Sequence, residues 1–143
     1  MVCADSSLLL KLYLREPETP AALAALNNVA GPVIFTPLHR LEIVNAIRRN
    51  LASQRIHRRQ AQSALQTLRS DLRSGFYLQP PLDWTRVFQR AHQLSRKHAR
   101  RLLVRSLDLL HVALALELGA TEFLTFDDRQ KQTASAEGLK VAP

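Results

Sequence analysis

The sequence is poor in cysteine and in long apolar runs, and each scarcity excludes a class of protein. Its 143 residues include one cysteine, Cys3, which excludes an intrachain disulfide and a cysteine-rich metal site. No apolar run reaches the roughly 18 residues that a transmembrane helix needs, and no basic segment precedes an apolar stretch at the N-terminus. We therefore expect a cytoplasmic protein that is neither secreted nor inserted in a membrane.

Glycine is also scarce, and histidine is not clustered. None of the four glycines belongs to a glycine-rich phosphate loop, which argues against nucleotide-dependent transfer. Ser6 and Ser7 lack the Gly-x-Ser-x-Gly surroundings of a hydrolase nucleophile, so capping or support of a metal-bound water suits them better. The histidines form no His-Glu-x-x-His helix, which argues against zinc. We expect them to be mainly surface or packing residues: His39, His57, His92, His98 and His111.

Acidic residues are rare in the middle of the chain. From Pro37 to Arg105 there are 15 lysines and arginines against 3 acids, whereas the rest of the chain holds 5 against 9. The whole chain carries a formal net charge of +8, which favours a polyanionic partner such as nucleic acid. Solvated helix faces are the alternative interpretation of the basic middle, and the sequence leaves both open.

Length and patterning favour one α/β domain over residues 1–143. The chain is 46% hydrophobic and 22% charged, as in ordinary globular proteins. Apolar segments alternate with helical patterns, which predicts a parallel sheet with helices on both faces. We expect strands at 2–4, 31–37, 76–81, 121–126 and 139–142. We expect helices at 8–16, 21–29, 38–54, 58–73, 84–99, 106–119 and 128–138.

Three of these helices carry more specific predictions. A serine should cap the first helix, and Ser106 should cap the helix that Gly119 ends. That later helix is apolar nearly all round, so we expect it to be buried on more than one side. In the helix at 38–54, one apolar stripe makes the helix amphipathic, and its surface is compatible with packing in the core or with a partner groove: Leu41, Val44, Ile47 and Leu51.

Two predicted strands end in aspartate. Asp5 follows the strand at 2–4, and Asp127 follows the strand at 121–126. The carboxyl ends of parallel strands share one edge of the sheet, where functional crevices form. Asp108 begins a helix and Glu42 lies within another, so both are candidates to join them.

Each acid also has a plain structural interpretation. Asp5 is placed to cap the following helix, and Asp108 lies where a negative charge meets the helix dipole favourably. Glu42, opposite the apolar stripe, reads as a solvated side chain. Asp127 and Asp128 read as turn and cap residues.

If the acids converge, a functional interpretation gains weight over the structural ones, because neighbouring carboxylates repel one another unless a cation compensates them. Oxygen ligands without cysteine favour a hard divalent ion, Mg²⁺ or Mn²⁺. In a nucleic-acid hydrolase such an ion polarises a phosphoryl oxygen and activates water. Nearby arginines would hold the flanking phosphates.

Four segments, in this order, resemble the signature segments of PIN-domain ribonucleases, and in particular the VapC toxins of bacterial toxin–antitoxin pairs. They are "ADSSLLLKLYLRE", "LEIVNAIRR", "SLDLLHVALALELGA" and "FLTFDDRQ". The resemblance implies a three-layer α/β/α sandwich with a central parallel sheet of about five strands. It also implies an acidic pocket for Mg²⁺ or Mn²⁺, endonucleolytic cleavage of RNA, a homodimer, and a VapB-like antitoxin as partner.

The resemblance also implies roles for individual residues. The catalytic carboxylates would be Asp5, Glu42, Asp108 and Asp127, and of these Asp5, Asp108 and Asp127 would bind the metal. Supporting positions would be Ser7, Asn45, which shares the helical face of Glu42, and Thr125, beside the last acid. Asp128 competes with Asp127 for the fourth position. The spacing from Thr125 favours Asp127, and Asp128 is expected to cap the following helix.

Two other functions remain open at this point. A non-catalytic PIN-like module that binds RNA or protein would keep the fold and the basic helices, but it has no need of a repulsive acidic cluster. A receiver-type signalling domain also has acids at strand ends. It needs a lysine after its last strand, and Lys140 lies inside the closing strand.

Overall fold

The computed structural model describes residues 1–143, which form five strands and seven helices. The strands are β1 Val2–Ala4, β2 Val33–Ile34, β3 Tyr77–Leu78, β4 Glu122–Leu124 and β5 Lys140–Ala142. The helices are α1 Ser6–Leu10, α2 Thr19–Asn27, α3 Pro37–Ala52, α4 Arg58–Ser74, α5 Trp84–Leu102, α6 Ser106–Glu117 and α7 Asp128–Ala136. No helix combines the length and the apolar character needed to cross a lipid bilayer.

All five strands are parallel and lie in the order β3-β2-β1-β4-β5. The chain builds the sheet from β1 to β3 on one side, then crosses back and adds β4 and β5 on the other. The strand order therefore reverses beside β1, and a crevice is expected beyond the carboxyl ends of β1 and β4. The prediction of a parallel sheet of about five strands is confirmed, and β3, which precedes Pro80 and Pro81, lies at the edge.

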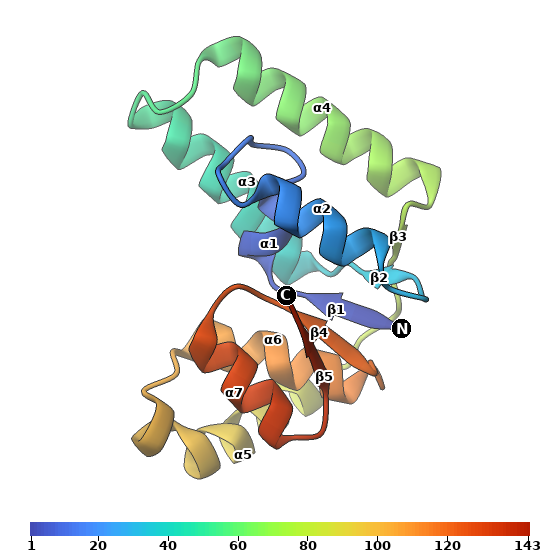
Figure 1. The fold of residues 1–143 in the computed structure, drawn as a ribbon, viewed down its shortest axis with the longest axis vertical. Helices are drawn as coiled ribbons and strands as arrows, with labels where there is room; N and C mark the ends of the chain where they lie inside the picture. Colours follow the sequence, from blue (N-terminus) through green and yellow to red (C-terminus); the bar gives the residue numbers. More distant parts are fainter.

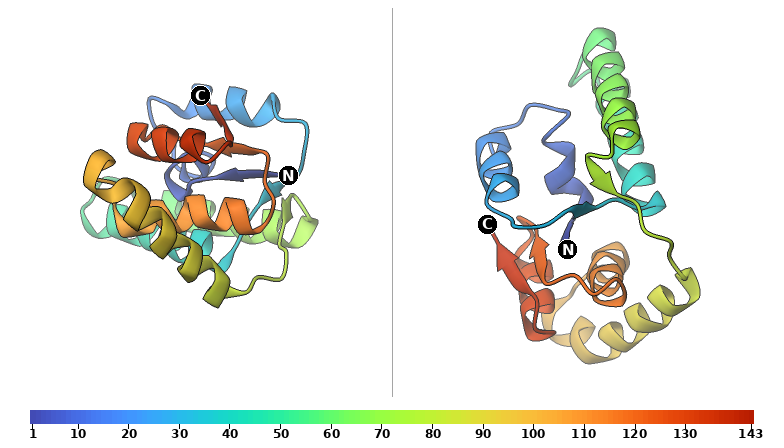
Figure 2. Two further views of the ribbon diagram at one scale, coloured as in Figure 1. Left: turned by 90° about the horizontal axis from the view of Figure 1, so that it is seen from below. Right: turned by 90° about the vertical axis from the view of Figure 1, so that its right-hand side faces the viewer.

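Helices cover both faces of the sheet (Figures 1 and 2). Helices α1 to α4 lie on one side and α5 to α7 on the other, with the strands between them. Successive strand residues alternate between the two cores, because side chains in a strand point to opposite faces. Val2 and Ala4 pack with α1 to α4, whereas Cys3 packs with α5 to α7. The three-layer α/β/α prediction is confirmed.

Helix α6 has the deepest position in the second core. Its eight consecutive residues Asp108 to Ala115 are all buried, which confirms the prediction of burial on more than one side. Ser106 does not cap it, however. Arg105 occupies the N-cap position, and its side chain makes no capping bond.

The first helix differs from its prediction at both ends. It covers Ser6–Leu10 rather than 8–16, and Asp5, not a serine, caps it by accepting a hydrogen bond from Leu8 N. After Leu10 the chain continues in hydrogen-bonded turns, and Lys11 pairs with Glu16 and Glu18. Leucine spacing alone could not reveal this local ion pairing.

The apolar stripe of α3 does not pack in the core as a whole. Leu41 is 68% exposed and Leu51 is exposed, and only Ile47 of the stripe is fully buried. The buried face carries Leu38, His39, Ile43 and Ile47 instead. His39 can lie in the core because both ring nitrogens have partners, Thr36 and the Ala4 carbonyl oxygen. The helix therefore buries the face that carries His39 and exposes the face that carries Leu41 and Leu51.

Candidate active site

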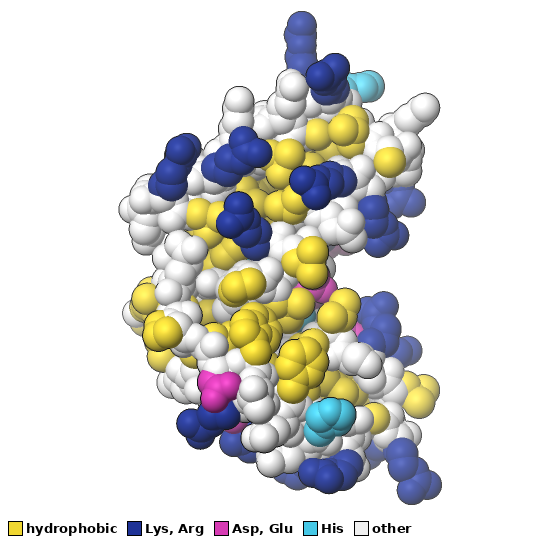
Figure 3. All heavy atoms as spheres, turned by 180° about the vertical axis from the view of Figure 1, so that it is seen from behind, with side chains coloured by type: hydrophobic (Ala, Val, Ile, Leu, Met, Phe, Trp, Pro, Cys, Tyr) yellow, Lys and Arg dark blue, Asp and Glu magenta, His cyan; other side chains and the backbone are white.

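A small cavity of about 180 Å³ lies beyond the carboxyl ends of β1 and β4, and no hydrophobic residue lines it. We call it the acidic pocket. In Figure 3, acidic side chains show inside a notch on one side of the molecule, with lysines and arginines above and below it. The pocket is lined by Asp5, Ser6, Ser7, Glu42, Arg105, Asp108, His111, Asp127 and Gln130.

Asp5 leaves β1 directly into the pocket and is only 3% exposed. Its Oδ1 accepts from Leu8 N at 2.8 Å, and its Oδ2 accepts from Ser7 Oγ at 2.8 Å. Burial raises the pKa of this carboxyl even though these bonds, the nearby His111 and the Thr125 hydroxyl lower it. Burial thus outweighs the hydrogen bonds and the charge that surround Asp5.

Asp108 is held by two donors in the first turn of α6. Its Oδ1 accepts from Gln130 Nε2 at 3.0 Å, and its Oδ2 accepts from Arg105 Nε at 3.0 Å. Gln130 Nε2 also lies 3.4 Å from Asp5 Oδ2, so one neutral amide bridges two carboxylates. The other amide atom, Gln130 Oε1, is buried without a partner.

Asp127 fills two roles with two different oxygens. Its Oδ1 caps α7 by accepting from Arg129 N and Gln130 N, both at 2.9 Å. Its Oδ2 lies 3.9 Å from Arg105 Nη2 in the pocket. The prediction that Asp128 caps this helix is therefore wrong: the Asp128 side chain is 86% exposed and lies outside the pocket.

The hydroxyl group of Thr125 supports the turn that carries Asp127. Thr125 is fully buried at the end of β4, and its Oγ1 accepts a hydrogen bond from Asp127 N at 3.0 Å. This bond fixes the backbone at the point where the chain leaves the sheet. The structure thus places Thr125 beneath the pocket rather than on its wall.

Glu42 enters the pocket from α3. Its Oε2 accepts from Ser6 Oγ at 2.7 Å and pairs with His111 Nε2 at 2.6 Å. Burial raises the pKa of Glu42, but the hydrogen bond and charge of His111 and the bond from Ser6 outweigh it, so the pKa is lowered. An ionised carboxylate has no proton to donate, and His111 Nε2 must therefore be the protonated ring nitrogen.

The pocket contains three residues that were not singled out from the sequence as site residues: Arg105, His111 and Gln130. Arg105 and His111 lie three residues before and after Asp108, so this spacing on one helix was an available signal. His111 was expected to be a surface or packing residue, and His39 and His98 are likewise buried with hydrogen-bonded rings. Gln130 is placed by the cap of α7, which no sequence pattern announced.

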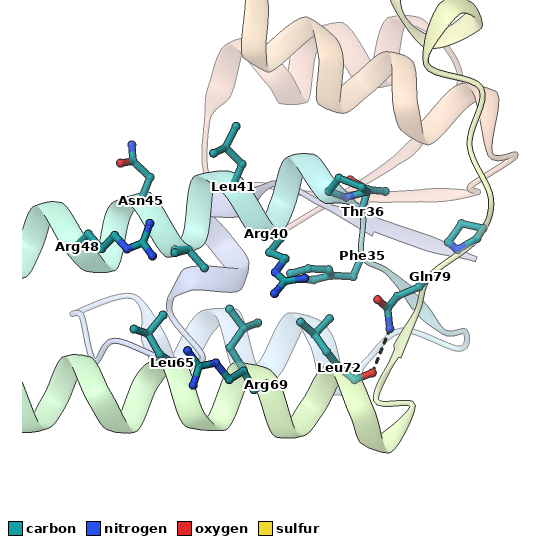
Figure 4. A pocket seen from close by; sticks show the side chains of 14 residues that line it. Phe35, Thr36, Arg40, Leu41, Asn45, Arg48, Leu65, Arg69, Leu72 and Gln79 are labelled. Carbon is teal, nitrogen blue, oxygen red and sulfur yellow. Dashed lines mark hydrogen bonds between the residues drawn. The ribbon is translucent and has the colours of Figure 1, made fainter.

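Asn45 does not join the pocket. It lies on the rim of a second cavity, about 670 Å³, between α3 and α4, which we call the α3–α4 groove. Figure 4 shows Asn45 and Leu41 pointing away from α4, while Arg40 points towards it. The groove combines three arginines with apolar walls: Arg40, Arg48, Arg69, Phe35, Leu41, Val44, Leu65, Leu68 and Leu72.

The donor set of the acidic pocket suits a hard divalent cation, because it offers carboxylate and hydroxyl oxygens and no thiol. Burial raises the pKa of Asp5, and a cation beside it would favour its ionised form. In this conformation no three His, Cys, Asp or Glu side chains are grouped closely enough to hold one ion. Arg105 and Gln130 lie between the carboxylates and hold them instead.

The fold and the site define a class of protein: an α/β/α sandwich whose carboxylates gather where the strand order reverses. Comparison with known proteins agrees with this class. Residues 2–136 match the family model described as the PIN domain. A relative, "Ribonuclease VapC46" of Mycobacterium tuberculosis, is 31% identical over 139 residues, which are 96% of this chain and 92% of that protein. The chain therefore belongs to the PIN-domain family.

Two solved structures share the fold. The toxin VapC20 of Mycobacterium tuberculosis, described as cleaving the Sarcin-Ricin loop, aligns with a TM-score of 0.70 and 16% identity over the full length of both chains. FitAcB from Neisseria gonorrhoeae aligns with a TM-score of 0.65 and 14% identity, covering 100% of this chain and 97% of that one. The resemblance found in the sequence segments is confirmed.

Proposed function

We propose that this protein is a metal-dependent endoribonuclease and the toxin component of a VapBC-type toxin–antitoxin module. One observation carries the proposal: Asp5, Glu42, Asp108 and Asp127, from four separate segments, all line one pocket at the switch point of the sheet. Membership of the PIN family and the VapC ribonuclease relative support the same activity. VapC nucleases of this family generally need a divalent metal.

Asp5, Asp108 and Asp127 would hold the metal, which we take to be Mg²⁺ or Mn²⁺. When bound, the ion supplies charge that polarises a phosphoryl oxygen and lowers the pKa of water. Ser7 Oγ and Leu8 N fix the Asp5 carboxylate, and the α7 cap fixes Asp127. These bonds orient the carboxylates before any ligand arrives, which is how outer hydrogen bonds improve a metal site.

Glu42 acts as the proton acceptor for the attacking water. Ser6 and His111 both bind Oε2, which leaves Oε1 free to take a proton. The lowered pKa of Glu42 keeps it ionised at neutral pH, as a general base requires. The neighbouring His39, whose pKa burial lowers to about 3, adds no positive charge beside this pair.

An RNA substrate suits the charge distribution. Most of the positive charge belongs to the stretch from Pro37 to Arg105, and Figure 3 shows lysines and arginines on both sides of the acidic notch. Phosphates that flank the cleaved bond would bind there, and the affinity should fall as salt rises. The acidic pocket alone would repel RNA, so the basic surroundings are part of the site.

The α3–α4 groove is the surface we assign to a VapB-like antitoxin. Apolar walls and three arginines suit an amphipathic segment that carries acidic side chains. Self-association is a separate proposal. It rests on exposed apolar side chains, among them Phe76, Phe88 and Leu107, and light scattering of the purified chain tests it.

Growth arrest on expression tests the toxin function most simply. We expect arrest with the wild-type chain, none with Asp5→Asn, and rescue by co-expression of the neighbouring small open reading frame. A soluble wild-type chain that leaves growth unaffected and RNA intact would instead favour the non-catalytic module.

A further inference from the structure

Arg105 is the only lysine or arginine that lines the acidic pocket, and the mechanism above does not use it. Its backbone is fixed at the start of α6, where Leu109 N donates to Arg105 O at 3.0 Å. Its side chain is 74% exposed, yet the guanidinium reaches back over the pocket to two carboxylates. Arg105 thus has a fixed backbone and a long, exposed side chain.

The Arg105 side chain contacts two carboxylate oxygens that accept no hydrogen bond from any other group of the protein. Asp108 Oδ1 is taken by Gln130, and Asp127 Oδ1 is taken by the α7 cap. The remaining oxygens, Asp108 Oδ2 and Asp127 Oδ2, lie 3.0 Å from Arg105 Nε and 3.9 Å from Arg105 Nη2. An ion bound by both aspartates would need these same two oxygens.

Because it is exposed, the Arg105 guanidinium can be displaced from Asp108 and Asp127. Ion pairs in contact with water are weak, because solvent screens them and the long side chain loses freedom. A divalent ion carries twice the charge of the guanidinium and has no side-chain freedom to lose, so it can displace Arg105 from the two carboxylates. Once displaced, Arg105 remains attached at the pocket mouth, where its planar fork suits a phosphate.

We propose that Arg105 is a built-in counter-cation of the acidic pocket. It neutralises Asp108 and Asp127 before metal binds, yields their Oδ2 atoms to the ion, and then contacts a phosphate of the RNA. The inference rests on the proposed metal-dependent function and adds a residue to it.

Mn²⁺ titration of the full chain by calorimetry, without RNA, tests the first half. We expect Arg105→Gln to bind Mn²⁺ about three- to tenfold more tightly than wild type, because a competing cation is gone. Arg86→Gln is the matched control: it removes the same charge from a side chain that is 72% exposed, and it contacts Glu117 at the opposite end of α6. This control should bind Mn²⁺ like wild type.

Binding of an RNA analogue tests the second half. With Mn²⁺ present, Arg105→Gln should bind an oligonucleotide with a non-cleavable linkage about threefold more weakly than wild type, and Arg105→Lys should fall between them. Circular dichroism checks the fold, and Arg105→Met, which also removes the charge, replaces Arg105→Gln in both titrations if Arg105→Gln is unfolded.

The outcomes separate the two proposals. A wild-type chain that binds no Mn²⁺ overturns the metal-dependent function itself. A wild-type chain that binds Mn²⁺ as tightly as Arg105→Gln overturns only the role of Arg105. Equal tightening by Arg86→Gln also overturns it, because net charge would then explain the effect.

Discussion

The acidic pocket and the α3–α4 groove are neighbours built on the same helix, and they differ in nearly every physical property. The pocket holds about 180 Å³, has no apolar lining, and fixes its carboxylates by hydrogen bonds. The groove holds about 670 Å³ and combines apolar walls with arginines. Glu42 lines the pocket, whereas Leu41, one residue before it, and Val44, two residues after it, line the groove. Chemistry and association are therefore divided between two faces of α3.

This division predicts that each face can be disabled without the other. Substitutions in the pocket should remove RNA cleavage and leave antitoxin binding through the groove intact. Substitutions on the groove rim should do the reverse. RNA cleavage therefore reports on the acidic pocket, and antitoxin binding reports on the α3–α4 groove.

Asp5→Asn should have the largest effect, a loss of RNA cleavage of about a thousandfold. The asparagine oxygen still caps α1, so the fold should be kept while the charge is lost. Cleavage of a fluorescent RNA is the measurement, with binding to the antitoxin as the control that should not change. Cleavage at the wild-type rate would remove Asp5 from the mechanism.

Asp127→Asn and Asp128→Asn form a matched pair of neighbouring substitutions. We expect Asp127→Asn to reduce cleavage about a hundredfold, because the Oδ2 atom in the pocket loses its charge. Asp128→Asn should cleave like wild type, since this side chain is exposed outside the pocket. The reverse result would mean that the structure assigns the fourth acid to the wrong aspartate.

His111 tests whether Glu42 must be held in place. His111→Leu removes the donor at 2.6 Å from Glu42 Oε2 and should lower the cleavage rate about ten- to a hundredfold. His111→Gln keeps an N–H donor and should recover part of the loss. If the two variants are equally impaired although both are folded, the histidine acts only through packing.

Leu41→Glu tests the groove with the smallest expected change. It places a charge on the exposed rim residue, so we expect antitoxin binding about tenfold weaker and cleavage unchanged. Leu41→Ala is the control for loss of the side chain alone. A cleavage defect as large as the binding defect would show that the two faces of α3 are not independent.

Sequence reasoning located the acids that lie at the ends of elements, because topology alone brings Asp5, Asp108 and Asp127 to one edge of a parallel sheet. It chose Asp127 rather than Asp128 for the pocket, where the structure has Asp127, but it wrongly gave the cap of α7 to Asp128, because it allowed each residue one role and Asp127 performs two with separate oxygens. It missed His111 and Gln130 as pocket residues because their partners, Glu42 and Asp5, are 69 and 125 residues away in the chain. Contacts of this kind appear only once the layers are assembled.

The buried face of α3 shows the same limit. A count of leucines favoured Leu41 and Leu51, but His39 occupies the core because Thr36 and the Ala4 carbonyl oxygen satisfy its ring. The exposed Leu41 thereby becomes part of the groove. The buried His39 and the exposed Leu41, which both contradict the amphipathic pattern, thus orient α3 between the acidic pocket and the α3–α4 groove.

RNA cleavage by the wild-type chain after chelation is the most direct test of the central claim, that the four carboxylates work through a divalent ion. We expect chelator to abolish cleavage, and added Mg²⁺ or Mn²⁺ to restore it in the wild type but not in Asp5→Asn. Cleavage that persists in excess chelator at the untreated rate, from a preparation whose Asp5→Asn variant is equally active, would contradict the account.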